Sequence, residues 1–134
     1  MLRFSEPFEN LEQMMDTFSG RWRGGLMPMD AYEKDGIYTL RFDLPGVHPQ
    51  TVDVTVEGFT LTVTAEAPED DPGDVTWLLR ERPSGHHRRE VRLGEHLDPG
   101  LVDASFDNGV LTVTIPMREE SKPYKVSINP STRD

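Results

Sequence analysis

The 134-residue chain contains no cysteine, which excludes disulfide bonds, thiolate zinc sites and cysteine nucleophiles. It has no apolar run long enough to cross a membrane, and its first residues lack the basic stretch followed by a hydrophobic one that is typical of a signal peptide. Lysine and arginine number 14 against 24 aspartates and glutamates, a net charge of −10. We therefore expect a cytoplasmic protein with no membrane partner and, because phosphate contacts need clustered basic residues, no nucleic-acid partner.

The motifs of nucleotide-binding and hydrolytic proteins are missing as well. The chain has no G-x-x-x-x-G-K-[ST], G-x-G-x-x-G, H-E-x-x-H or G-x-S-x-G segment. His86 and His87 do not suggest a metal site, because adjacent residues on a strand point to opposite faces. We therefore predict that the protein is not an enzyme and uses no metal and no cofactor.

Alternation of apolar and polar residues is the main structural signal in the chain. Turn residues such as Asn108-Gly109 separate the alternating runs, and Asn-Gly tolerates the positive φ of a tight hairpin. The runs lie at positions 38–44, 52–56, 59–63, 102–106 and 111–115. They predict an all-β fold, an antiparallel β-sandwich whose strands turn one face to the core and one to water.

The first 27 residues follow a different pattern, because their apolar residues recur at helical spacing. Ser5 can cap a helix that begins near Glu6-Pro7, and glycines at positions 20–25 end it. The apolar face of this helix would consist of Phe4, Phe8, Leu11, Met14, Met15 and Phe18. The helix either packs on the protein's own core or offers an adaptable surface to non-native proteins and partner subunits, for which flexible Met side chains are suited.

An acidic, proline-containing loop at positions 67–76 is followed by the apolar run Trp77-Leu78-Leu79. An apolar run in so polar a loop needs a surface that buries it, in the same chain or in a neighbouring one. Arg89 shares strand parity with Val91 and Leu93, so it should face inward or into an interface. A guanidinium in such a place must be paired with carboxylates or carbonyls.

After Pro116 the chain becomes polar, and Val126 and Ile128 stand near its end at i, i+2 spacing. In an extended chain both side chains point the same way. They form either a last strand packed on the chain's own sheet, or a plug on a tether that docks in an apolar groove bordered by residues 51–57 and 101–107.

Six fragments of the chain resemble, in the family's order, the small heat-shock proteins of bacterial type, the α-crystallin-domain chaperones. Residues 104–111 are similar to the family's A-x-x-x-N-G-V-L signature, and V-x-I at Val126 and Ile128 is similar to its terminal I-x-I motif. The other fragments lie at 28–33, 40–47, 61–66 and 80–93. The chain departs from the family's pattern at His87 and Gly94, where Phe and Pro are usual.

The resemblance implies an N-terminal arm at 1–27, an immunoglobulin-like α-crystallin domain at 28–116 and a flexible C-terminal extension at 117–134. It implies an ATP-independent holdase that binds unfolded client proteins, forms at least a homodimer and works with ATP-driven chaperones. The dimer interface would contain Trp77, Leu78, Leu79 and Arg89, while Val126 and Ile128 would be the docking motif. A β-sandwich adaptor for one fixed protein partner is the alternative, since fold does not settle function.

Overall fold

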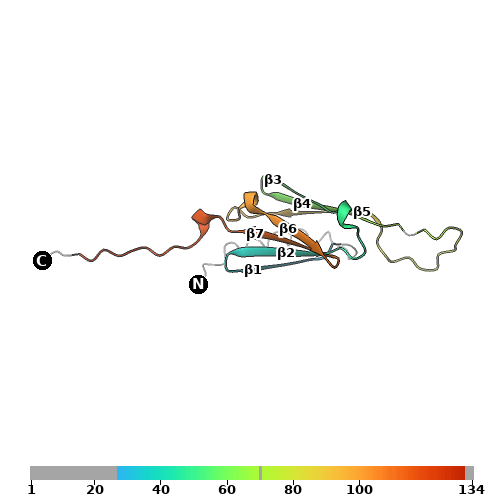
Figure 1. Ribbon diagram of the computed structural model, residues 1–134, viewed down its shortest axis with the longest axis horizontal. Helices are drawn as coiled ribbons and strands as arrows, with labels where there is room; N and C mark the ends of the chain where they lie inside the picture. The colour runs from blue at the N-terminus through green and yellow to red at the C-terminus, as the bar shows by residue number, and fades with distance from the viewer. Residues whose placement is uncertain (1–26, 70, 132–134) are drawn as a thin grey trace.

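The computed structural model describes residues 27–69 and 71–131, and within them the chain folds into two antiparallel sheets (Figure 1). One sheet has the strand order β1-β2-β7-β6 and the other the order β3-β4-β5. The strands are β1 (Met29–Lys34), β2 (Ile37–Asp43), β3 (Asp53–Glu57), β4 (Thr60–Ala67), β5 (Gly85–Arg92), β6 (Asp103–Asp107) and β7 (Val110–Pro116). Three short 3-10 turns accompany them: η1 (Pro49–Thr51), η2 (Pro99–Leu101) and η3 (Glu119–Ser121).

The predicted all-β sandwich is confirmed, and each of the five alternating runs corresponds to a strand: β2, β3, β4, β6 and β7. Strands β1 and β5 were not indicated by alternation. The inward positions of β1 include Glu33, and those of β5 include His87 and Arg89, so neither strand shows a clear apolar stripe. Both are edge strands: the inward face of β1 is half-buried, and on β5 Val91 alone is fully buried.

The core lies between the sheets and is built mainly from the central strands β2, β4 and β7. Side chains of alternate residues on these strands face the opposite sheet, as the period of two requires. Phe42, Leu40, Leu44, Leu61, Ile115, Val63, Val91 and Val113 are the largest fully buried side chains. Because burial of apolar area stabilises by about 25 cal/mol per Å², this cluster is the main source of stability of the domain.

Two hairpins of the sandwich are built from similar sequences. The segment from Pro49 to Thr64, which forms β3 and β4, shares Pro, Val-Asp and Leu-Thr-Val-Thr with the segment from Pro99 to Thr114, which forms β6 and β7. Each begins with a 3-10 turn and reverses at residues with positive φ: Gly58 in one, and Asn108 with Gly109 in the other. The predicted Asn-Gly turn is thus confirmed, and β3 and β6 are equivalent edge strands.

Tyr38 links stability to alkaline pH. Burial, and secondly the charge of Glu33, raises the pKa of Tyr38 from 10.0 to about 12. As the pH rises, the unfolded state therefore loses this proton before the folded state does. The stabilisation that comes from the raised pKa of Tyr38 is complete below pH 10 and is lost as the pH rises through 12. At about 1.36 kcal/mol per pKa unit, the loss is at most about 2–3 kcal/mol. Urea unfolding at pH 9 and pH 12 should show a smaller loss in Tyr38→Phe than in the wild type; an equal loss would contradict this origin.

Candidate interaction surfaces

The loop between β4 and β5 leaves its apolar run uncovered. Residues 68–84 contain no strand or helix among their described positions, and the loop projects from one end of the sandwich (Figure 1). Trp77 is 48% exposed, Leu78 94% and Leu79 73%. The guanidinium of Arg80 lies 4.5 Å from the centre of the Trp77 ring and covers part of it by a cation–π contact. The part of the chain that the structure describes therefore leaves this run largely uncovered, contrary to the interpretation that it packs within the same chain.

Arg89 faces inward on β5, opposite Val63 of β4, as its strand parity predicted. It is half-buried, and burial lowers the pKa of its guanidinium. Its Nη1 donates a hydrogen bond to the carbonyl oxygen of Met27 at 2.7 Å. Met27 is buried and has a φ of 71°, in the left-handed region that is uncommon for a residue with a side chain. The predicted carbonyl partner of Arg89 is thus present, and its place in a dimer interface stays a prediction.

The bond from Arg89 to Met27 also shows how the two sheets lie on each other. It joins the β5 edge of one sheet to the segment that leads into β1, at the edge of the other sheet. The opposite edges, β3 and β6, therefore share the other side of the sandwich. We call the inward side chains of these two strands and the residues that precede them the β3–β6 edge. It consists of Val52, Val54, Val56, Val102, Ala104 and Phe106.

The β3–β6 edge is apolar and incompletely covered. Five of its side chains are half-buried against the core, and Ala104, on the same inward face, is exposed. The outward positions that border it are acidic: Asp53 and Glu57 on β3, and Asp103 and Asp107 on β6, all exposed. Neither strand carries a basic residue. An apolar strip with an acidic rim suits a segment that is apolar on one side and basic on the other.

The C-terminal segment is such a segment, and it does not pack on its own sheet. Residues 122–131 have no regular secondary structure, and Val126 and Ile128 are 69% and 88% exposed. The interpretation of a last strand on the chain's own sheet is therefore wrong. The segment leaves the sandwich at the end opposite the loop of residues 68–84 (Figure 1).

Arg118 fixes the point from which this segment leaves. Its backbone N–H donates to the carbonyl of His96 at 2.7 Å, and its Nε donates to the carbonyl of Leu97 at 3.2 Å. Its guanidinium lies 5.4 Å from the centre of the Phe59 ring. Arg118 thus ties the chain to the loop that follows β5 and to the turn between β3 and β4. The sequence did not single out Arg118, because its partners are main-chain carbonyls and a ring distant in sequence.

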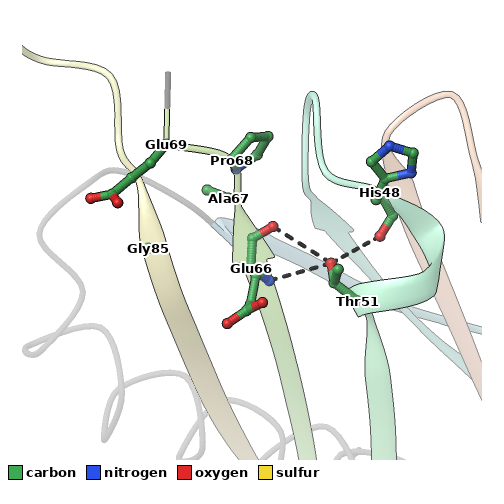
Figure 2. Close-up of a pocket in the computed structure, with 7 residues that line it drawn as sticks. All are labelled: His48, Thr51, Glu66, Ala67, Pro68, Glu69 and Gly85. Carbon is green, nitrogen blue, oxygen red and sulfur yellow. Dashed lines mark hydrogen bonds between the residues drawn. The ribbon is translucent and has the colours of Figure 1, made fainter. Parts of the chain in front are cut away.

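A hollow of about 320 Å³ lies at the base of the loop, between η1, the end of β4 and the start of β5 (Figure 2). The hydroxyl of Thr51 donates to the carbonyl of His48 at 2.9 Å and accepts from the backbone N–H of Glu66 at 3.4 Å. These bonds tie η1 to β4 where the loop begins. The lining consists of His48, Thr51, Glu66, Ala67, Pro68, Glu69 and Gly85.

The two adjacent histidines do point to opposite faces. His86 is exposed, with its Nδ1 4.0 Å from a carboxylate oxygen of Glu66, whereas His87 is half-buried, with its Nε2 3.0 Å from the carbonyl of Ser84. Within residues 27–69 and 71–131, no three His, Cys, Asp or Glu side chains lie so that they could share a metal ion. That part of the chain also contains no helix with the length and apolar content to cross a membrane. The predicted arm helix and its apolar face at positions 4–18 lie outside the described residues.

Comparisons with a family model and with related sequences indicate one family. A model described as the Hsp20/alpha crystallin family matches residues 30–129. The chain is 38% identical over 130 residues to the 18 kDa antigen of Mycobacterium leprae (strain TN), covering 96% of this chain and 87% of that protein. It is 37% identical over 132 residues to the 18 kDa heat shock protein of Streptomyces albus G, covering 96% and 92%.

Solved structures show the same fold. Heat shock protein 16.0 from Schizosaccharomyces pombe is similar with a TM-score of 0.62 and 29% identity, covering 81% of this chain and 87% of that one. A small heat-shock protein from Xylella fastidiosa is similar with a TM-score of 0.64 and 24% identity, covering 78% of this chain and 97% of that one.

Proposed function

Because the chain belongs to the Hsp20/alpha crystallin family, we propose that it is a holdase, a chaperone that binds non-native proteins without ATP and prevents their aggregation in the cytoplasm. The observation that carries this proposal is the match of the Hsp20/alpha crystallin family model to residues 30–129, which span the sandwich and the V-x-I motif. Non-native proteins expose apolar surface, and mutual burial of such surface needs no bond-making chemistry. The net charge of −10 keeps a protein with such surface soluble.

The chain has no nucleotide-binding motif, so energy for release must come from elsewhere, and we propose that ATP-driven chaperones take over the bound proteins. We propose that the apolar face of residues 4–18 supplies the client-binding surface. Its Met and Phe side chains can repack against varied partners, which a binder of many sequences needs. The alternative of an adaptor with one fixed partner has no specific observation in its favour.

The apolar run of the loop is proposed to join two copies of the chain into a dimer. Its side chains are exposed in the single chain, and β1 is an edge strand whose outer backbone groups can accept a further strand. Arg89 lies beside that edge, because it binds the residue that leads into β1. Pairing of the loop with this edge would cover both the apolar run and the unpaired strand.

Docking of the C-terminal segment on the β3–β6 edge of another copy is supported by shape and by charge. Val126 and Ile128 project from the same side of an extended chain, and the edge offers apolar side chains at the same period. Residues 122–131 contain Lys122 and Lys125 and no acidic residue, whereas the rim of the edge is acidic. Because the segment leaves its own sandwich pointing away, a second copy is the occupant we propose (Figure 1).

Holdase activity predicts that the protein suppresses light scattering by a heat-labile client enzyme at a near-equimolar ratio. Suppression should be equal with and without ATP, because the binding is burial of apolar surface alone. An acidic, non-chaperone protein of similar size is the control. Absence of suppression, or suppression only when ATP is added, would refute the proposed function.

The proposed docking predicts that Val126→Ala with Ile128→Ala shifts larger assemblies toward dimers. Each buried aliphatic side chain is worth about 1.5–3 kcal/mol before ordering costs, and alanine retains only part of it. Light scattering should show the fall in mass. Thermal unfolding of the sandwich, followed by circular dichroism, should be the same as in the wild type. Ser127→Ala with Asn129→Ala, on the opposite side of the segment, is the matched control. Wild-type mass in the Val126/Ile128 variant would mean that the segment only solubilises the protein.

A further inference from the structure

We propose that the C-terminal segment docks through three side chains, with Tyr124 as a third anchor in an apolar subsite of its own at one end of the β3–β6 edge of a second copy. This inference rests on the docking proposed above and extends it. It assigns a binding role to a residue outside the V-x-I motif.

The spacing of the segment carries the inference. Tyr124, Val126 and Ile128 stand at i, i+2 and i+4, so in an extended chain all three leave the same side. They are 83%, 69% and 88% exposed, so none of them is buried by its own chain. At about 3.3 Å per residue, the three side chains span about 13 Å.

The receiving edge has the same length. Val52, Val54 and Val56 face the same side of the β3 chain at the same period, and the residue at position 52 is extended, with φ −91° and ψ 122°. A plug of two residues covers two of these three positions and leaves one end valine uncovered. Three anchors cover the whole row. Ala104 on the facing strand is small and exposed, which leaves room beside the row for bulky side chains.

Two prolines restrict the backbone on either side of the three anchors. Pro123 fixes its own φ, and Lys122 before it is extended, with φ −77° and ψ 143°. Pro130 disfavours the helical region for Asn129. The anchors therefore lie between two pairs of residues, 122–123 and 129–130, that the prolines restrict, and this reduces the entropy lost on docking.

Tyrosine suits a subsite at the end of such an edge. Its ring supplies a large apolar area, and its hydroxyl can stay in water or donate to a carboxylate of the acidic rim. Lys125 lies on the opposite side of the segment from the three anchors. With the anchors on the valines, Lys125 points away from the core, toward the acidic outward positions.

The test uses a labelled peptide of residues 122–131 and the full chain carrying Tyr124→Ala, Val126→Ala and Ile128→Ala, whose own segment lacks all three proposed anchors and therefore does not compete. In fluorescence anisotropy the wild-type peptide should bind, the Tyr124→Ala peptide should bind about tenfold more weakly, and the Tyr124→Phe peptide should bind within about twofold of wild type. The Ser127→Ala peptide is the matched control and should bind like wild type. Peptide substitutions cannot unfold the receiving protein, so the comparison stays decisive.

A double-mutant cycle then identifies the end of the valine row that the Tyr124 ring contacts. Val52→Ala or Val56→Ala in the receiving chain should be non-additive with Tyr124→Ala at one end of the row and additive at the other. Additivity at both ends overturns the third subsite. Equal binding of the wild-type and Tyr124→Ala peptides overturns it while leaving the docking proposal intact, whereas no binding of the wild-type peptide overturns both.

Discussion

In a chain that carries Val126→Ala and Ile128→Ala, and so lacks the proposed C-terminal links, replacing Trp77, Leu78 and Leu79 together with serine should convert a dimer into a monomer at micromolar concentration. Each of these side chains contributes about 1.5–3 kcal/mol when it is buried, so their combined loss should raise the dimer dissociation constant at least about 100-fold. The three residues are exposed in the single chain and lie outside the core, so the sandwich should keep its fold. Sedimentation equilibrium measures the change in mass directly.

A matched variant of the same loop separates loss of apolar contact from general damage to the loop. Glu69→Ser, Asp71→Ser and Asp74→Ser also change three exposed side chains, and in the same background this variant should stay dimeric. Circular dichroism should show the same β signature for both variants. If the apolar variant stays dimeric, or the wild type sediments as a monomer, the loop does not join the subunits.

Phe42→Ala should cost the most stability of any single core truncation, about 3–5 kcal/mol. Phe42 has no exposed surface and is the largest of the fully buried side chains. Domains of this kind have only about 5–15 kcal/mol in total, so the variant should unfold at a much lower urea concentration. Measurements at one fixed protein concentration remove the effect of association on the midpoint.

Phe42→Leu is the control for this prediction, because it keeps most of the buried volume and should cost clearly less. Ser127→Ala, in the exposed C-terminal segment and outside the proposed anchors, should leave the free energy of unfolding unchanged within about 0.5 kcal/mol. If Phe42→Ala costs no more than Phe42→Leu, the core between the sheets is not packed as described.

How much of the fold can be predicted depends on what a strand places on its inward face. Central strands such as β2 and β7 bury one whole face, so Leu40, Phe42 and Val113 stand out against polar neighbours. Edge strands bury less, and their inward positions can hold Arg89 or Glu33. Alternation therefore indicates the central strands and the edges β3 and β6, whose inward side chains are apolar, and misses the edges β1 and β5, whose inward positions are partly polar.

The candidate surfaces could be predicted where a pattern of side chains defines them. They could not be predicted where backbone carbonyls or strand register define them. The apolar run after the acidic loop was visible in the sequence, and so was the spacing of Tyr124 with Val126 and Ile128, although only the last two were singled out. The partner of Arg89 was not visible, because any residue can supply a carbonyl and Met27 is 62 positions away. The acidic rim needed the register of both hairpins before Asp53 and Asp107 could be seen to border one strip.

The opposite exits of the loop and the C-terminal segment set the connectivity of an assembly (Figure 1). In the proposed dimer, two loops would form a two-fold contact that uses the same patch on both subunits. No further subunit could then join at that contact. The proposed dimer would still have two segments to donate and two β3–β6 edges to receive them, so it could form four further links. Donor and acceptor differ, so the proposed links would be head-to-tail and would propagate until geometry closes them into a ring or shell. A ligand that covers either the C-terminal segment or the β3–β6 edge should therefore stop the growth of the assembly and leave the dimer intact.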